Sequence, residues 1–468
     1  MTSRYKHARA YLLLVGLPVL ATWAVLQVGT SLRSPGRVLQ TALATAAVAP
    51  LDLVKLVIQI CTILLVSRFI GTLFKKIRQP QVVGEMAAGI VLGPSVLGWI
   101  APSFSQAIFP ASSLAYLNAL SQVGLVLFMF LVGVTIDPRE LRGHGRAAIL
   151  ASHASIAVPF CLGSALALIL YEPFSGGGVP FTAFALFMGV AMSITAFPVL
   201  ARILTERGLM RSPLGTLAIA CAAVDDVTGW CILSFIVVLV RAERASSTGW
   251  VTVGGAIVYV LFMMLLLGPS LLRFDAHFRK AGQLTDGAIS LMIAFALASA
   301  LATEWIGIHL VFGAFLMGAI MPKSPDFVAT LKNKMESMTV VVLLPLFFAL
   351  NGLRTNLGAL HGWLWFYCLL VILVAITGKV GGSMAAARMA GVPWREAASL
   401  GVLMNTRGLM GLVALNVGLD IGVISQTVFS IMVLMALVTT FMASPLLDWI
   451  YPRAAVCGPE PAVRAVFA

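Results

Sequence analysis

The chain has 468 residues, of which 60% are hydrophobic and 10% are charged, with a formal net charge of +13. This composition excludes a soluble protein with a charged surface and leaves no room for a sizeable soluble domain. The positive charge does not indicate nucleic-acid binding, because the basic residues lie in short stretches between apolar segments. We therefore expect an all-α polytopic membrane protein.

The apolar segments predict about 14 transmembrane helices. A helix needs roughly 20 residues to cross the hydrocarbon layer, and fewer where the chain is irregular. In chain order, the segments are 10–28, 51–74, 82–100, 114–136, 147–171, 181–204, 214–240, 250–272, 288–302, 305–321, 338–350, 363–387, 397–419 and 424–450.

The first segment follows Arg4, Lys6 and Arg9. Its apolar part exceeds the roughly 7 to 15 residues of a cleavable signal peptide, so we interpret it as an extra anchoring helix. Residues 1–50 then form this helix and an external linker. Residues 51–450 form the main membrane domain, and residues 451–468 form a short cytoplasmic tail.

The basic residues predict the orientation of the chain. Cytoplasmic loops are enriched in lysine and arginine. One set of alternate loops and ends holds 21 of these residues, and the opposite set holds only Arg33, Arg37, Arg241, Arg244 and Arg354. This asymmetry predicts a multi-pass protein of the bacterial inner membrane with both termini in the cytoplasm.

Two adjacent carboxylates, Asp225 and Asp226, lie in the middle of segment 214–240. A rise of about 1.5 Å per residue places them roughly 16 Å into a hydrocarbon layer about 30 Å thick. An ionisable group at this depth costs at least about 2.5 kcal/mol and is tolerated where it faces water, a counter-ion or a transported ion. The pair therefore predicts a transport site.

Segment 181–204, directly before the aspartates, contains a predicted helix break. Pro198 lacks an N–H and is expected to free the carbonyl of Ile194, four residues earlier. Thr195 adds a hydroxyl beside this opening. Oxygens of this kind are suitable ligands for a dehydrated alkali cation.

A second break is predicted in segment 397–419, where Asn405, Thr406 and Arg407 interrupt the apolar sequence. The two broken segments are seven apart, so they cross the membrane in opposite directions. This arrangement is typical of an inverted repeat whose two broken helices cross at the midplane. Arg407 has two open interpretations: it compensates exposed carbonyls at a half-helix end, or it takes part in ion coupling.

These residues predict a mechanism of exchange. A buried carboxylate is costly as a bare charge, so it is expected to bind a proton and a cation in turn. Because the two ions compete for one site, their transport is coupled in opposite directions, as in an antiporter. An intramembrane aspartyl protease is a poor alternative, because neighbours on one helix point about 100° apart and cannot form its facing dyad. We expect no enzyme activity. A channel-like potassium efflux protein or a cation-coupled organic solute transporter remains the alternative.

Five motifs, in order, resemble the monovalent cation:proton antiporter-2 family, which includes Kef-type and sodium/proton exchangers. They are GEMAAGIVLGPSVLG from Gly84, the break at Thr195 and Pro198, AAVDDVTGW from Ala222, ITGKVGGS around Lys379, and NTRGL from Asn405. The resemblance covers about residues 51–450. It implies an exchanger of Na⁺ or K⁺ for protons. We expect this exchange to be electrogenic, because Asp225 and Lys379 beside Asp226 offer a second exchangeable proton. Related exchangers with asparagine in place of the first acid look electroneutral, which agrees in direction.

The resemblance also implies a homodimer with a dimerisation domain and a core domain, the latter comprising about residues 147–240 and 363–450. Asp226 and Asp225 would bind the monovalent cation and the proton, with Thr195 as a further cation ligand. Lys379 would pair with Asp225 when no cation is bound. The expected partners are the cation, the proton and the lipid bilayer, without nucleic acid and without a resident cofactor.

Overall fold

The computed structural model describes residues 8–32, 52–77, 79–110, 113–135, 146–175, 178–210, 212–244, 249–271, 285–307, 309–358 and 360–451. Within these ranges the chain is helical and has no strand, only an isolated β-bridge between Ser175 and Ile424. The predicted all-α class is confirmed. Most of the predicted external linker and nearly all of the predicted tail lie outside the described residues.

The helices follow the predicted apolar segments. Eleven of those described are long and apolar enough to cross a membrane, and three shorter apolar helices, Phe181–Ser193, Leu310–Ile320 and Met410–Asp420, lie in three further segments. In chain order the elements are η1 (Leu12–Gly16), α2 (Leu17–Gly29), α4 (Leu53–Lys76), α5 (Gln81–Leu92), α6 (Leu97–Ile100), α7 (Pro102–Ile108), α8 (Leu114–Thr135), α9 (Arg146–Phe174), α10 (Phe181–Ser193), α11 (Phe197–Glu206), α12 (Pro213–Arg244), α13 (Gly249–Phe262), η3 (Met263–Leu267), α15 (Asp286–Ile306), α16 (Leu310–Ile320), α17 (Pro325–Met338), η4 (Thr339–Leu343), α18 (Leu344–Arg354), α19 (Leu364–Ile376), η5 (Thr377–Gly381), α20 (Gly382–Met389), α21 (Trp394–Met404), α22 (Gly408–Asp420) and α23 (Gln426–Ile450).

One predicted boundary is wrong by more than three turns. The segment expected at 338–350 belongs to a continuous helix, Pro325–Arg354, that comprises α17, η4 and α18. Its first part is polar and carries Lys332 and Lys334, both exposed, and Glu336, which is half-buried. A proline in the first turn favours the start of a helix at this end. The polar residues can then be helical without an apolar sequence, because a helix forms its backbone hydrogen bonds internally.

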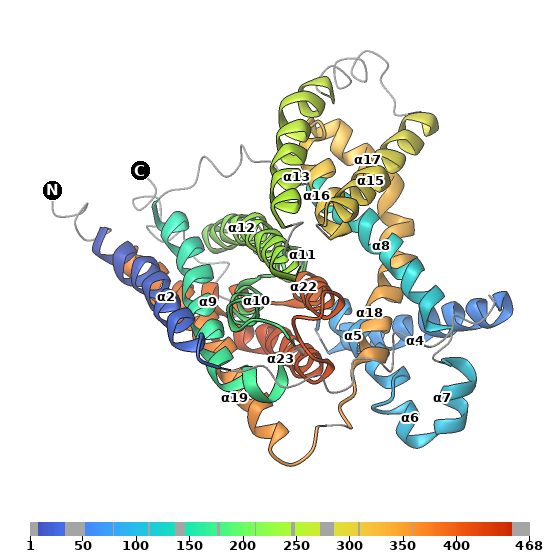
Figure 1. Ribbon diagram of the computed structural model, residues 1–468, viewed down its shortest axis with the longest axis horizontal. Coiled ribbons are helices and arrows are strands. Elements are labelled where there is room, and N and C mark those ends of the chain that lie inside the picture. Colours follow the sequence, from blue (N-terminus) through green and yellow to red (C-terminus); the bar gives the residue numbers. More distant parts are fainter. Residues whose placement is uncertain are drawn as a thin grey trace.

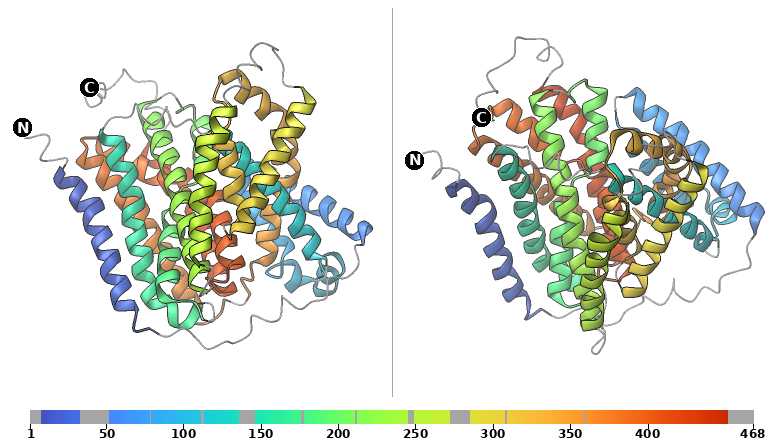
Figure 2. Two further views of the ribbon diagram at one scale, coloured as in Figure 1. Left: turned by 45° about the horizontal axis from the view of Figure 1, so that its top comes forward. Right: turned by 90° about the horizontal axis from the view of Figure 1, so that it is seen from above.

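The helices form a bundle around α10, α11, α12, α22 and α23 (Figures 1 and 2). On one side of this centre, α9 packs against α10 and α12. On the other side, α8 packs against α16 and α18, and α5 packs against α4 and α18. The helices α22 and α23 contact α5, so they connect the two sides. The helices α10 and α11, which precede the aspartate helix α12 in the sequence, therefore lie in the middle of the molecule together with α22, which follows it.

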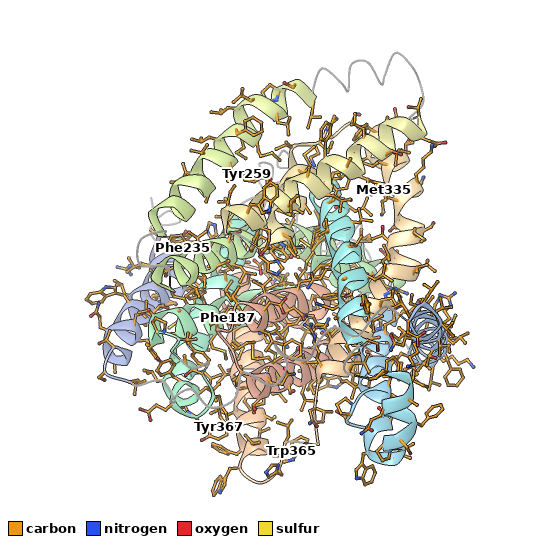
Figure 3. The ribbon with its side chains drawn as sticks, turned by 45° about the vertical axis from the view of Figure 1, so that its right-hand side comes forward. Phe187, Phe235, Tyr259, Met335, Trp365 and Tyr367 are labelled. Atoms are coloured by element: carbon orange, nitrogen blue, oxygen red, sulfur yellow. The ribbon has the colours of Figure 1, made fainter. Side chains whose placement is uncertain are left out.

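The side chains differ between the centre and the outside of the bundle. Phe187 of α10 is completely buried in the middle, whereas Trp365 of α19 lies at the edge and is 52% exposed (Figure 3). Outer helices such as α4 and α13 present large apolar side chains, among them Leu65 and Val258. Apolar outer surfaces of this extent fit a hydrocarbon environment and not water.

The extra N-terminal helix packs against α9 and α10. Gly29 at the end of α2 lies so close to Phe181 that a Cβ atom would stand 1.8 Å from its ring, which explains why only glycine fits there. At the other end, Tyr11 and the Nδ1 atom of His153 in α9 are 3.1 Å apart and form a hydrogen bond. The predicted extra helix thus exists and contacts the side of the bundle that contains the aspartate helix.

Candidate functional site

The helix α12 carries Asp225 and Asp226 into the centre of the bundle. The side chain of Ser212 accepts a hydrogen bond from the N–H of Gly215 at 3.0 Å and so caps the helix, and Pro213 occupies the first position. Three turns later, Asp225 is 0% exposed and Asp226 is 1% exposed. Both carboxylates are therefore removed from solvent, as the depth argument predicted.

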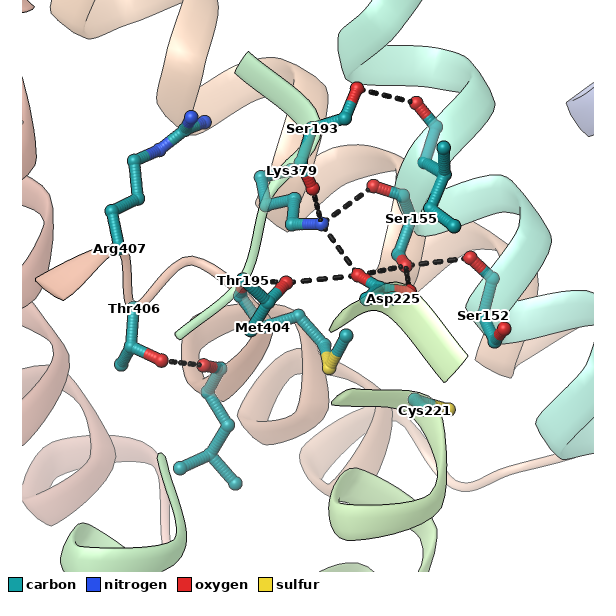
Figure 4. A network of polar contacts seen from close by, with 12 residues as sticks. Ser152, Ser155, Ser193, Thr195, Cys221, Asp225, Lys379, Met404, Thr406 and Arg407 are labelled. Atoms are coloured by element: carbon teal, nitrogen blue, oxygen red, sulfur yellow. Dashed lines mark hydrogen bonds and ion pairs between the residues drawn. The ribbon is translucent and has the colours of Figure 1, made fainter. Parts of the chain in front are cut away.

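Asp225 is the centre of a hydrogen-bond network formed by four elements (Figure 4). Its Oδ2 atom lies 2.7 Å from Nζ of Lys379 in an ion pair. It accepts a hydrogen bond from the Thr195 hydroxyl at 2.9 Å. The hydroxyl of Ser155 in α9 lies 2.7 and 2.8 Å from the two carboxylate oxygens. Its charge is therefore compensated by a cation and by two hydroxyl donors.

Lys379 lies in the π-helical turn η5 and is completely buried. Its ammonium group donates to the carbonyl of Ser155 at 2.8 Å, to the carbonyl of Ser193 and to Asp225. An ammonium group has three protons, so this geometry uses its full donor capacity. Wide turns of this kind inside α-helices occur frequently at functional sites.

The first helix break lies at 194–196, between α10 and α11. Ile194 leaves the helix with φ −65° and ψ 130°, and α11 begins at Phe197. Pro198 therefore lies in the first turn of α11, where a missing N–H is tolerated. The break exists as predicted, but the proline begins the second half-helix and does not interrupt a continuous one.

The second break lies at 405–407, between α21 and α22, and it meets the first. The N–H of Ala196 donates to the carbonyl of Thr406 at 2.8 Å, and the hydroxyl of Thr195 lies 3.1 Å from the carbonyl of Met404. The two irregular segments thus satisfy part of each other's backbone, which is the condition for non-helical backbone at membrane depth.

Gly408 permits this close approach. It begins α22 with a φ of +27°, and a Cβ atom there would stand 2.5 Å from the side chain of Val199. A residue with a side chain would be strained both in its backbone and against α11. The backbone N–H groups of Arg407 and Gly408 donate to the hydroxyl of Thr440 in α23 at 3.2 and 3.3 Å.

Arg407 is 1% exposed, and its guanidinium points away from Asp225 (Figure 4). Its Nη1 atom donates to the carbonyl of Ala191, near the end of α10, at 3.0 Å. A positive charge at the carboxyl end of a half-helix is stabilising because the free carbonyls there carry partial negative charge. The geometry thus favours the compensation of carbonyls over direct contact with the aspartates.

Asp226 differs sharply from its neighbour. Neither of its oxygens forms a hydrogen bond of normal geometry among the described residues, although the N–H of Phe197 interacts with the carboxylate. The structure therefore places Asp226 beside the start of α11, at the point where the two breaks meet. Of the two acids, it is the one whose oxygens are free to take a ligand.

The structure brings together all the residues that the sequence singled out. Thr195 and Lys379 both contact Asp225, and the remaining ones lie on the two breaks or beside them: Ile194, Pro198, Asn405, Thr406, Arg407 and Asp226. Sequence reasoning missed Ser155. The polar run of Ser152, His153 and Ser155 inside an apolar segment is a signal that could have indicated it.

A binding site for a resident metal is not visible in the described ranges, where no three His, Cys, Asp or Glu side chains cluster. The site instead consists of one free carboxylate, neutral oxygens and a compensated acid. Such a donor set fits a singly charged cation that is bound and released, because divalent ions prefer several carboxylates.

Residues 62–451 match the model of a family described as "Sodium/hydrogen exchanger, transmembrane". The chain is 44% identical over 398 residues to the Na(+)/H(+) antiporter NhaS4 of Synechocystis, covering 85% of this chain and 97% of that protein. It is 39% identical over 398 residues to Cation/H(+) antiporter 17 of Arabidopsis thaliana, covering 85% of this chain and 48% of that protein.

Over 404 residues, it is 35% identical to K(+)/H(+) antiporter 1 of Saccharomyces cerevisiae, covering 84% of this chain and 46% of that protein. The chain thus spans about half the length of these plant and yeast relatives. The solved structure of the sodium proton antiporter MjNhaP1 from Methanocaldococcus jannaschii superimposes with a TM-score of 0.57 at 17% identity, covering 86% of this chain and 99% of that one. This likeness confirms the predicted antiporter-like fold.

Proposed function

We propose that this chain, which belongs to the sodium/hydrogen exchanger family, exchanges a monovalent cation for protons across a membrane by alternating access. The observation that carries the proposal is the fully buried carboxylate of Asp226, which has no hydrogen-bond partner among the described residues and lies beside two broken helices. The names of its relatives include both Na⁺ and K⁺ exchangers, so either ion is a candidate substrate.

Asp226 is the proposed site where proton and cation compete. A bare charge is costly to carry through the membrane, so the site changes sides only when Asp226 is neutralised by one of the two ions. Asp225 and Thr195 shape the same site, and Lys379 is the counter-charge of Asp225. Arg407 holds the end of α10 and so stabilises the break.

The architecture around this site is proposed to follow the cation:proton antiporter-2 pattern, with a resemblance to Kef-type exchangers. In this proposal, residues 1–50 supply an extra helix and a linker, and residues 451–468 form a tail. Helices of about residues 147–240 and 363–450 form the moving core, the two breaks belong to an inverted repeat, and the protein is a homodimer. The packing of α9, α10, α12, α21 and η5 around the aspartates supports such a core.

We further propose the bacterial inner membrane as the location, with both termini in the cytoplasm, because basic residues concentrate on that side. In a cysteine-free background, a cysteine replacing Ser103 is expected to react with an impermeant maleimide added outside intact cells. One replacing Lys332 is expected to react only after the membrane is opened. Both positions are exposed, so reversed labelling would contradict the orientation.

Purified protein in proteoliposomes tests the exchange itself. With an internal pH dye, external Na⁺, K⁺ or Li⁺ is expected to drive protons out of acid-loaded vesicles, with saturation at increasing cation concentration. Choline serves as the control cation, because it cannot enter a site built from closely spaced oxygens. Equal proton flux with choline and with the alkali cations would contradict the proposal.

A further inference from the structure

Two completely buried polar side chains beside the helix crossing have no hydrogen-bond partner. Asp226 and Asn405 are each 1% exposed. Among the described residues, neither the two carboxylate oxygens of Asp226 nor Oδ1 and Nδ2 of Asn405 form a hydrogen bond of normal geometry. Buried polar atoms are nearly always partnered, so an unpartnered pair requires an explanation. Asn405 does not act as an anchor for the backbone, which is the usual role of a buried asparagine.

The backbone contacts place these two residues on either side of one short segment. Met404 and Thr406, the neighbours of Asn405, are hydrogen bonded to Thr195 and Ala196. The next residue in that segment, Phe197, interacts through its N–H with the carboxylate of Asp226. Asn405, directly after the end of α21, and Asp226 in α12 therefore flank the segment 195–197.

The charges around the crossing leave Asp226 as the acid that an ion can neutralise. Asp225 is already paired with Lys379 and bonded to two hydroxyl groups. Arg407 donates to the carbonyl of Ala191, and no ion pair joins it to Asp226 within the described part of the chain. A single carboxylate, combined with neutral oxygens such as that of a side-chain amide, matches a singly charged alkali cation in charge and in ligand type.

We propose that Asn405 is a direct ligand of the transported cation: its Oδ1 atom and the carboxylate of Asp226 hold the same dehydrated monovalent ion. This inference rests on the proposed function and adds the second broken helix to the binding site. When a proton replaces the cation on Asp226, the same Oδ1 atom accepts the hydrogen bond of the carboxylic acid. Asn405 thus contacts the site both with a cation and with a proton bound. Loss of its side chain is expected to weaken cation binding more than proton binding, because a cation needs several oxygen ligands.

The test compares cation binding and transport in Asn405→Ala and Asn405→Asp with the wild type. Binding is measured as the rise in melting temperature of the detergent-solubilised protein with increasing NaCl, KCl or LiCl at constant ionic strength. Transport is measured as the cation KM in the proteoliposome assay. We expect Asn405→Ala to weaken the apparent affinity by about tenfold or more, as for the loss of one good polar ligand contact. We expect Asn405→Asp, which keeps an oxygen at this position, to stay within about threefold of the wild type or to bind more tightly.

Asn351→Ala is the matched control, because Asn351 is also a buried asparagine but donates to the carbonyl of Phe347 at 2.7 Å, outside the crossing. It is expected to lower the melting temperature and to leave the cation affinity unchanged. Asn405→Ala with wild-type affinity overturns the inference and leaves the exchange function intact. If Asn405→Ala does not fold, a tenfold loss of affinity in Asn405→Asp overturns it instead. A wild type without cation-driven proton flux overturns the proposed function, and this inference with it.

Discussion

Asp226→Asn is expected to abolish exchange while the protein still folds. The amide has nearly the volume of the carboxylate, but it carries no charge for a cation and cannot exchange a proton near neutral pH. A buried cation without its counter-charge costs several kcal/mol. Each 1.4 kcal/mol is tenfold in an equilibrium constant, so we expect the exchange rate to fall below about 1% of the wild type. Proton flux in proteoliposomes at saturating wild-type cation concentration provides the measurement.

The folded state of this variant is checked by its melting temperature and by size-exclusion chromatography in detergent. Because the variant removes a bare buried carboxylate, it is expected to melt at or above the temperature of the wild type in the absence of cation. Asp286→Asn, at a carboxylate whose side chain is 97% exposed, is the matched control and should transport normally. Exchange at the wild-type rate in Asp226→Asn would show that the ion binds elsewhere.

Exchange by the wild type is expected to be electrogenic, and Lys379→Ala is expected to remove most of its dependence on membrane potential. A single acid gives a neutral swap of one proton for one cation. Here a cation at Asp226 stands next to the ion pair between Asp225 and Lys379, whose atoms are 2.7 Å apart. Its positive charge disfavours the ammonium group, so that Lys379 releases a second proton as the cation enters.

The measurement is the cation gradient that vesicles build under an imposed potential. If two protons exchange for one cation, one net charge moves per cycle, and 100 mV contributes about 2.3 kcal/mol. This corresponds to about 50-fold in the cation gradient at equilibrium. In Lys379→Ala the gradient should follow the pH difference alone.

Ser155→Ala is the matched control for Lys379→Ala. It removes a hydrogen bond to Asp225 of 2.7 Å but no charge. We expect slower exchange with an unchanged voltage dependence, because the number of titrating groups is the same. A wild type that ignores the imposed potential would contradict the two-proton mechanism and leave Lys379 as a structural counter-charge.

Particular helices show where sequence reasoning succeeds. The aspartate helix was predicted at 214–240 and is observed as part of α12, because a long apolar run with a serine and proline at its start has few alternatives in a membrane. The breaks at 194–196 and 405–407 were predicted from a proline and from a polar interruption, both of which oppose a continuous apolar helix. The helix Pro325–Arg354 was predicted too short, since its first turns are polar and lack the apolar signal.

The membrane setting, the helical class and the residues that carry charge at membrane depth can all be predicted from the sequence alone. These are local properties, because hydrocarbon forces each spanning segment to satisfy its own backbone and makes every buried charge conspicuous. Which of these groups contact each other depends on the tertiary structure. It paired Lys379 and Thr195 with Asp225, added Ser155 from α9, and left Asp226 and Asn405 without partners. Such contacts join residues up to 224 positions apart, as between Lys379 and Ser155, and depend on the crossing of four helical elements, for which one sequence holds no local pattern.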